Sequence, residues 1–153
     1  MQTPGPDLGD RFTDRVRKVF QIANEEAIRL NCEFIGTEHV LLALLAEGSG
    51  AAFHVLKNLA VDERIREEVV KLHDRKTNTI TQGVLPHAPA VRRVIEYSMK
   101  EASELRQHYV GTEHVLLALL RENTGVAAQV LMIAGLDITT VRAAVLKLLG
   151  HPK

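Results

Sequence analysis

The sequence predicts an all-α protein made of two copies of one four-helix unit, related by pseudo-two-fold symmetry. Two observations predict this fold. The ten residues GTEHVLLALL occur at 36–45 and again at 111–120, and identity of this length indicates an internal repeat. Apolar residues in both copies recur at spacings of three and four, and no segment alternates apolar and polar residues for long, which is typical of helices.

The repeat extends well beyond these ten residues, at an offset of 75. Towards the end of each copy the offset becomes 76, because Ile65 and Val69 align best with Val141 and Val145. One residue is therefore missing from the first copy. The predicted organisation is a disordered extension (1–10) followed by a single domain (11–150), which consists of repeat 1 (12–73), a flexible linker (74–86) and repeat 2 (87–149).

Four helices are expected in the first copy. Thr13 is a good N-cap for a first helix that continues to about Leu30. Thr37 is predicted to cap a second helix that ends near Gly48. A third helix is expected over 51–59, and a fourth begins after its cap, Asp62.

The second copy repeats this order. Pro89 stands at the start of its first helix, where a missing N–H costs nothing. Gly111-Thr112 and Gly125 mark the next two helix starts, and Asp137 is predicted to cap the last helix. With eight helices and short loops, we expect a compact monomer.

Composition excludes several classes of function. Lys+Arg and Asp+Glu both number 19, and a chain without positive excess is a poor candidate for binding nucleic acid or an anionic membrane. The single cysteine, Cys32, rules out an internal disulfide and a Cys-rich zinc site and suits a reducing compartment. With no signal peptide and no apolar run near 18 residues, the expected location is cytoplasmic.

No motif for catalysis, nucleotide binding or metal binding is found. The chain lacks a phosphate-binding G-x-x-x-x-G-K-[ST] loop, H-E-x-x-H, paired cysteines and G-x-S-x-G. His39 and His114 occupy equivalent places near helix starts, and we interpret them as packing or capping residues rather than metal ligands. We therefore expect no enzyme activity, no cofactor and no metal.

The Gly-Thr-Glu-His helix starts are the remaining candidates for function. Glu38 and Glu113 could merely complement the helix dipole. Alternatively, each carboxylate receives a cation from a partner, and an arginine guanidinium suits it best because its fork matches a carboxylate. Spacing alone favours the dipole interpretation. The flanking residues that would support such a site are Thr37, His39, Thr112 and His114.

The doubled GTEH-containing helix, together with RFTDRVRKVFQIANEEAIRL and APAVRRVIEYSMKEASEL before its two copies, closely resembles the Clp N-terminal repeat domain. This is the N-domain of the Clp/Hsp100 AAA+ unfoldases, and the resemblance is closest to the ClpC branch. It covers about residues 11–150. It implies an eight-helix double-repeat fold that binds substrates and adaptor proteins for an ATPase ring and, in ClpC-like members, recognises phosphorylated arginine.

The resemblance also implies the binding residues. The family's two sites use the Glu of each GTEH and a Thr at the start of a first helix. These carry over to Thr13 and Glu38 for the first copy and to Glu113 for the second, where Ala88 replaces the threonine. The first site is therefore expected to bind phosphoarginine more tightly, so that Glu38→Ala removes most of the affinity and Glu113→Ala removes little.

The ATPase modules that should follow in this family are absent from the sequence. We expect a stand-alone module that binds adaptors, arginine-phosphorylated substrates or a Clp ATPase. The alternative is a helical scaffold or regulator that kept the fold but no longer serves Clp proteolysis. The presence of both Thr13 and Glu38 favours retained binding.

Overall fold

The structure is a computed structural model that describes residues 8–72 and 82–150. The predicted disordered extension and linker lie largely outside these residues. Within them the chain is all-α, which confirms the predicted fold class. The eight helices of the described residues are α1 (Asp14–Arg29), α2 (Thr37–Glu47), α3 (Ala51–Asn58), α4 (Ile65–Leu72), α5 (Pro89–Glu104), α6 (Thr112–Glu122), α7 (Val126–Ile133) and α8 (Ile138–Leu148).

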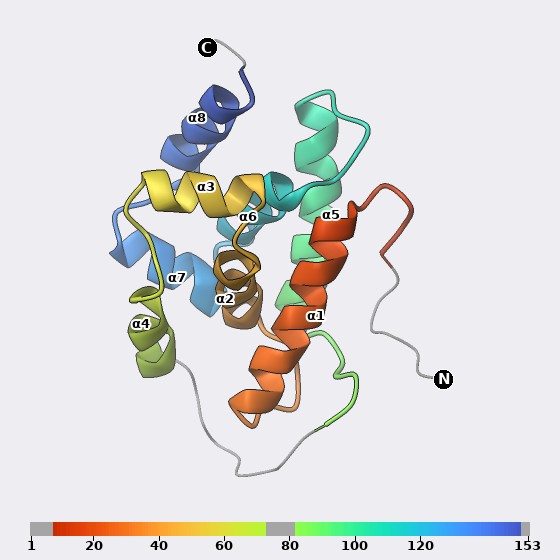
Figure 1. The fold of residues 1–153 in the computed structure, drawn as a ribbon, viewed down its shortest axis with the longest axis vertical. Helices are drawn as coiled ribbons and strands as arrows, with labels where there is room; N and C mark the ends of the chain where they lie inside the picture. The colour runs from red at the N-terminus through yellow and green to blue at the C-terminus, as the bar shows by residue number, and fades with distance from the viewer. Residues whose placement is uncertain (1–7, 73–81, 151–153) are drawn as a thin grey trace.

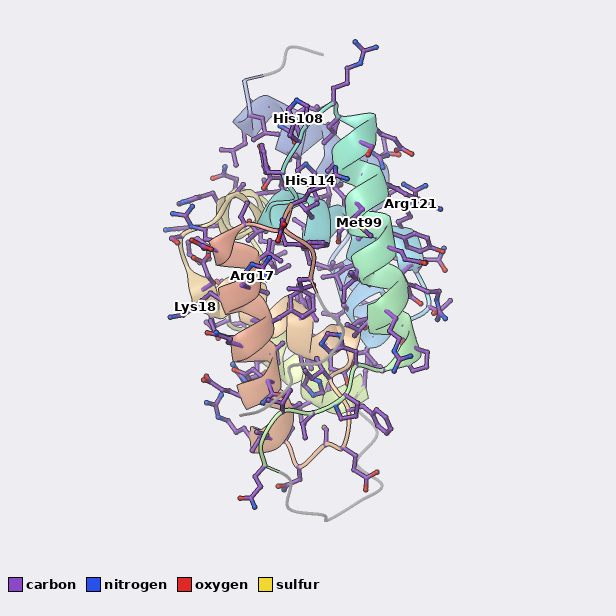
Figure 2. All side chains as sticks on the ribbon, turned by 90° about the vertical axis from the view of Figure 1, so that its right-hand side faces the viewer. Arg17, Lys18, Met99, His108, His114 and Arg121 are labelled. Atoms are coloured by element: carbon purple, nitrogen blue, oxygen red, sulfur yellow. The ribbon has the colours of Figure 1, made fainter. Side chains whose placement is uncertain are left out.

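The two GTEH helices, α2 and α6, form the centre of the molecule (Figure 1). Every residue of α2 from Thr37 to Leu45 is buried, and so is every residue of α6 from Thr112 to Leu120. Helix α1 packs on α2, and α5 packs on α6. Figure 2 shows α1 and α5 together on one face of the molecule. The ten-residue segment that is identical in both repeats is therefore the core on which the outer helices pack.

The two repeats interlock rather than form two separate bundles. Helix α3 of the first repeat packs on α6 and α8 of the second, and α7 of the second repeat packs on α2 and α4 of the first. This exchange is symmetric, as the pseudo-two-fold relation requires. It buries apolar surface from both repeats in one continuous core, so neither repeat can complete its core alone.

Glycine, not threonine, is the N-cap of each central helix. Gly36 and Gly111 have extended backbone at the N-cap position. The third helical residue is His39 in α2 and His114 in α6, and each ring Nδ1 accepts the N–H of its N-cap glycine at 2.8 Å. The histidines thus act as capping-box acceptors, which confirms their capping role.

The predicted capping role of Thr37 within its own helix is wrong, and its counterpart Thr112 does not cap its own helix either. Each hydroxyl oxygen instead accepts a backbone N–H from a helix start in the other repeat. Thr37 Oγ1 accepts from Ala127 of α7 at 3.2 Å, and Thr112 Oγ1 accepts from Ala52 of α3 at 3.0 Å. These two bonds cap helices across the repeat boundary and hold the repeats in register.

Two short backbone bridges cross the repeats at the starts of α1 and α5. Phe12 pairs with Val110 and Ile35 pairs with His87, both in parallel orientation. The N–H of Thr13 donates to the carbonyl of Val110 at 3.1 Å, and in the second bridge the N–H of Ala88 donates to Ile35 at 2.9 Å. Each first helix therefore begins beside the GTEH segment of the other repeat.

His87 is a buried histidine at the position that Phe12 occupies in the first repeat. It is 5% exposed, its ring lies 5.5 Å from that of Phe20, and its Nδ1 finds no hydrogen-bond partner among the described residues. Burial, followed by the charge of Arg92, lowers the pKa of His87 from 6.5 to about 4. The ring is consequently neutral in the folded protein at pH 7.

This burial predicts a loss of stability in acid. The unfolded chain binds the proton near pH 6.5 and the folded chain only near pH 4, so the free energy of unfolding should fall by about 3 kcal/mol as the pH drops across this window. His87→Phe, which installs the residue of the first repeat, should remove that loss. Denaturant unfolding of both proteins from pH 7 to pH 4 measures it, and a difference between them that is independent of pH would contradict the prediction.

Among the described residues, no single helix is long and apolar enough to cross a membrane. The helix pairs α2–α3 and α6–α7 reach the length and apolar composition of a membrane span only when the two helices of a pair are counted together. Each pair is bent by 91°. The buried residues of these helices belong to the core described above.

Candidate functional site

The structure pairs the predicted site residues differently from the sequence-based expectation. Thr13 lies in a cleft with Glu113, not with Glu38, and Ala88 lies in a second cleft with Glu38. The expected pairing of Thr13 with Glu38 in the first copy is therefore wrong. The physical reason is the pair of crossed backbone bridges, which place each first helix beside the GTEH segment of the other repeat.

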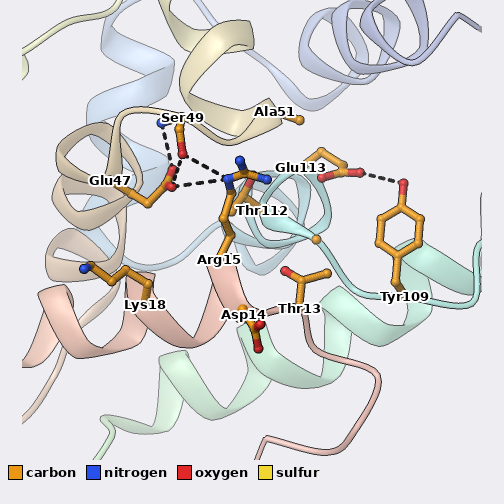
Figure 3. Close-up of a pocket in the computed structure, with 11 residues that line it drawn as sticks. Thr13, Asp14, Arg15, Lys18, Glu47, Ser49, Ala51, Tyr109, Thr112 and Glu113 are labelled. Carbon is orange, nitrogen blue, oxygen red and sulfur yellow. Dashed lines mark hydrogen bonds and ion pairs between the residues drawn. The ribbon is translucent and has the colours of Figure 1, made fainter.

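The first cleft, here called the Thr13 cleft, lies where α1, the end of α2 and the start of α6 meet (Figure 3). It has a volume of about 790 Å³. Most of the residues that line it are polar or charged. Its polar and charged lining side chains include Thr13, Asp14, Arg15, Lys18, Glu47, Ser49, Tyr109 and Glu113.

Glu113 supplies one of the carboxylates of the Thr13 cleft. Its side chain folds back over Gly111, where a Cβ atom would come within 2.5 Å of Glu113 Oε1. The Tyr109 hydroxyl donates to Glu113 Oε2 at 3.1 Å (Figure 3). Burial, then the charge and hydrogen bond of Glu113, raise the pKa of Tyr109 above its usual value of 10. The glycine is required here because it leaves room for the carboxylate.

Two cations, Arg15 and Lys18, also line this cleft. Arg15 donates through Nε to Ser49 Oγ at 2.9 Å and lies 3.4 Å from the carboxylate of Glu47 (Figure 3). Lys18 is exposed one turn further along α1. Burial would raise the pKa of Glu47, but hydrogen bonds from Ser49 and Gly50 and the charge of Arg15 lower it, so the carboxylate holds Arg15 in place.

Thr13 occupies the predicted N-cap of α1, and its hydroxyl oxygen accepts the N–H of Val16 at 3.2 Å. A threonine hydroxyl that accepts one hydrogen bond can also donate one. The positive end of the α1 dipole also faces this region. The Thr13 cleft thus combines the carboxylates of Asp14, Glu47 and Glu113 with the hydroxyl of Thr13 and the cationic side chains of Arg15 and Lys18.

The second cleft, here called the Ala88 cleft, is the pseudo-symmetric counterpart and has a volume of about 400 Å³. It contains the predicted site residue Glu38, which is 9% exposed and folds over Gly36 in the same way as Glu113 folds over Gly111. Among the residues that line it are Cys32, Glu33, Phe34, Glu38, Ala88 and Ala90.

The two capping histidines point their second nitrogen at different partners. Because Nδ1 of each ring accepts a backbone N–H, Nε2 carries the proton. In the second repeat His114 Nε2 therefore donates to Gln107 Oε1 at 2.5 Å, and in the first repeat His39 Nε2 lies 3.5 Å from the thiol of Cys32. Burial lowers the pKa of His114 despite the nearby charge of Glu113.

Nothing in the described part of the chain groups three or more His, Cys, Asp or Glu side chains in a way that could hold a metal ion. The chemistry that both clefts offer is recognition by charge and hydrogen bonding. A buried carboxylate at a rigid helix start suits a guanidinium, and hydroxyls beside cations suit an anion.

Comparison with known proteins decides the family. The model of the Clp repeat (R) N-terminal domain matches residues 11–101 and 88–153. The chain belongs to this family. The two matches cover both repeats.

Curated relatives support the same assignment. The chain is 47% identical over 147 residues to the ATP-dependent Clp protease ATP-binding subunit ClpC of Staphylococcus aureus, and 46% identical over 142 residues to a ClpA homolog of Guillardia theta. These alignments cover 95% and 92% of the chain but only 18% and 17% of the relatives. The predicted resemblance to the Clp N-terminal domain, with ClpC among the relatives, is confirmed.

Solved structures show the same fold at low sequence identity. The N-terminal domain of ClpD from Arabidopsis thaliana has a TM-score of 0.74 at 24% identity, covering 95% of this chain and 99% of that one. The N-domain of ClpV from Vibrio cholerae has a TM-score of 0.76 at 15% identity, covering 98% and 93%. A ClpV N-domain has also been solved in complex with a VipB peptide, with a TM-score of 0.70 at 14% identity, covering 96% of each chain.

Several residues of the Thr13 cleft escaped the sequence-based reasoning, namely Arg15, Lys18, Ser49 and Tyr109. Arg15 and Lys18 look like ordinary exposed residues of an amphipathic helix. A signal was nevertheless present in the repeat, because Arg15 and Tyr109 differ from their counterparts at an offset of 75, Ala90 and Phe34.

Proposed function

We propose that the chain is a protein-binding module of Clp-type proteolysis in the cytoplasm, and that its Thr13 cleft captures protein segments bearing phosphoarginine. In this role it binds adaptors or marked substrates and hands them to a Clp ATPase, without catalysis of its own. Family membership supports the general role. The VipB peptide bound by a ClpV N-domain is a precedent for a protein partner on this fold.

One observation supports the specific proposal: a carboxylate and groups that can donate to a phosphate line the same cleft. Glu113 can receive the guanidinium of phosphoarginine. The hydroxyl of Thr13, the start of α1 and the side chains of Arg15 and Lys18 can receive the phosphate. A ligand with both groups matches this cleft better than one with either group alone.

The test is calorimetric titration with a short peptide that carries one phosphoarginine. Glu113→Gln keeps the side-chain shape but removes the charge, and the loss of a charge-assisted hydrogen bond should weaken binding by about ten- to a hundredfold. Thr13→Ala should weaken it by about tenfold on the same grounds. The matched variant Glu38→Gln, at the equivalent position of the other repeat, should keep the affinity within about twofold.

This expectation reverses the one drawn from sequence, in which Glu38 carried the affinity. Thermal unfolding of all three variants controls for loss of fold. A larger loss from Glu38→Gln than from Glu113→Gln would contradict the assignment to the Thr13 cleft. Absence of binding by the wild-type chain would contradict phosphoarginine recognition as a whole.

A further inference from the structure

Tyr109 is the residue of the Thr13 cleft whose side chain controls the orientation of the Glu113 carboxylate. Its hydroxyl donates to Glu113 Oε2 at 3.1 Å, and Figure 3 shows the ring standing beside the carboxylate with the hydroxyl directed at it. Within the described part of the chain this is the only hydrogen bond that the carboxylate makes. Glu113 is only 4% exposed, so water can replace little of this contact.

The ring of Tyr109 is itself held by a rigid neighbour. Its centroid lies 5.5 Å from that of the His114 ring, at an interplanar angle of 55°. Both nitrogens of His114 are engaged, because Nδ1 accepts the N–H of Gly111 at 2.8 Å and Nε2 bonds to Gln107 Oε1 at 2.5 Å. Tyr109 therefore packs on a ring that cannot turn without losing the cap of α6.

This arrangement leaves the carboxylate open to a fork-shaped ligand. The side chain of Glu113 is confined on one side by Gly111, where an added Cβ atom would come within 2.5 Å of Oε1. Two ionised carboxylate oxygens offer about four acceptor positions, and Tyr109 occupies one of them. Both oxygens can still accept from a guanidinium, whose paired N–H groups require the carboxylate plane to be correctly oriented.

The other carboxylates of the Thr13 cleft are not available in this way. Glu47 forms an ion pair with Arg15 at 3.4 Å and accepts the backbone N–H groups of Ser49 and Gly50. Asp14 is an exposed residue in the first turn of α1. Glu113 is consequently the buried carboxylate of the cleft that remains for a ligand.

Comparison of the repeats separates this contact from the requirements of the fold. The ten residues from Gly36 and the ten from Gly111 are identical, but the residue two positions before each segment differs, being Phe34 in the first repeat and Tyr109 in the second. Phenylalanine lacks a hydroxyl. A GTEH helix start therefore forms without this phenol, which indicates that the hydroxyl of Tyr109 serves the cleft and not the fold.

We propose that Tyr109 is a positioning residue of the Thr13 cleft, which holds the Glu113 carboxylate in the orientation that receives the guanidinium of the bound side chain. The inference rests on the proposed function and deepens it, because it assigns the selectivity for an arginine-derived group to a pair of residues. Tyr109 acts through Glu113 and does not itself bind the ligand.

Calorimetric titration with the peptide acetyl-Gly-Leu-X-Gly-amide, where X is phosphoarginine, tests this role. Tyr109→Phe installs the residue of the first repeat and should weaken binding by about three- to tenfold, because the carboxylate must then be ordered by the ligand. Tyr97→Phe removes the hydroxyl of the other tyrosine, which lines neither cleft, and should leave the affinity unchanged. Thermal unfolding of both variants controls for loss of fold.

A double-mutant cycle shows whether Tyr109 acts through the carboxylate. In a Glu113→Gln background, Tyr109→Phe should weaken the remaining binding by less than about twofold, since the charged group that it positions is absent. A tyrosine that contacted the ligand directly would instead cause the same loss in both backgrounds.

A third measurement needs no ligand. Tyr97→Phe leaves Tyr109 as the single tyrosine of a chain without tryptophan, so ultraviolet absorbance follows its ionisation alone. Burial, then the charge and hydrogen bond of Glu113, raise the pKa of Tyr109, and Glu113→Gln should therefore lower that pKa. This measurement also remains decisive if Tyr109→Phe does not fold.

The proposal is overturned if Tyr109→Phe binds the peptide as tightly as the wild type, if its loss is the same in the Glu113→Gln background, or if Glu113→Gln leaves the Tyr109 titration unchanged. Failure of the proposed function has a different signature, in which the wild-type chain does not bind the peptide although the Tyr109 titration responds to Glu113→Gln. That result would also overturn the inference, because no bound guanidinium would remain to be positioned.

Discussion

Glu101→Ala should destabilise the chain by about 3 kcal/mol, since it removes a fully buried carboxylate that two arginines share. Glu101 is 0% exposed and lies on α5. Arg121 of α6 approaches its Oε2 at 3.0 Å, and Arg142 of α8 approaches the same oxygen at 2.8 Å and Oε1 at 3.0 Å. One carboxylate therefore ties three helices together.

The size of this effect follows from the burial of each partner. Loss of a carboxylate from a buried ion pair costs most when the charge left behind cannot reach water. The side chains of Arg121 and Arg142 are 30% and 35% exposed, so they regain part of their hydration and the cost stays at the lower end of the range for buried pairs.

Chemical denaturation measures the change, with Glu104→Ala as the matched control. Glu104 lies 3.4 Å from the same arginine, Arg121, but its side chain is 58% exposed. An exposed pair contributes about 0–1 kcal/mol, so this variant should remain close to wild type. Equal losses from Glu101→Ala and Glu104→Ala would show that burial of the carboxylate does not determine its contribution.

Gly125→Ala should destabilise the chain by about 2–3 kcal/mol, because its added methyl group would collide with the cap that joins the repeats. A Cβ atom at Gly125 would fall on the hydroxyl of Thr37, the atom that accepts the N–H of Ala127. The backbone of Gly125 has φ of −79°, which alanine adopts freely. The glycine is therefore required for close approach and not for its conformation.

A double variant distinguishes a collision with the Thr37 hydroxyl from conformational strain at Gly125. Thr37→Ala/Gly125→Ala removes the hydroxyl and should recover part of the stability lost in Gly125→Ala, whereas conformational strain would leave the loss unchanged. Gly9→Ala provides a control, since a Cβ atom there meets nothing within 4 Å. The denaturation midpoint of each of the three variants, compared with that of the wild type, measures the loss and its recovery.

Much of the fold follows from local patterns. The ten-residue repeat, the helical spacing and the caps at Thr13 and Asp137 identify the helices and their order, and the structure confirms both caps. These features depend on residues within one turn of each other, which a sequence displays directly.

The contacts between the two repeats could not be predicted from such local patterns. The bridge of Phe12 with Val110 joins residues about a hundred positions apart, and no local pattern specifies such a contact. The same crossing explains why Thr37 caps a helix of the other repeat instead of its own. Comparison of the two copies shows that Arg15 and Tyr109 carry groups that their counterparts Ala90 and Phe34 lack, but it does not show that they line the same cleft.

The most direct test of the account is a crystal structure of the chain with a phosphoarginine peptide. A single modified side chain is expected in the Thr13 cleft, with its guanidinium on Glu113 and its phosphate beside Thr13 at the start of α1. A phosphoarginine held by Glu38 in the Ala88 cleft, or a Thr13 cleft without the peptide under saturating conditions, would contradict it.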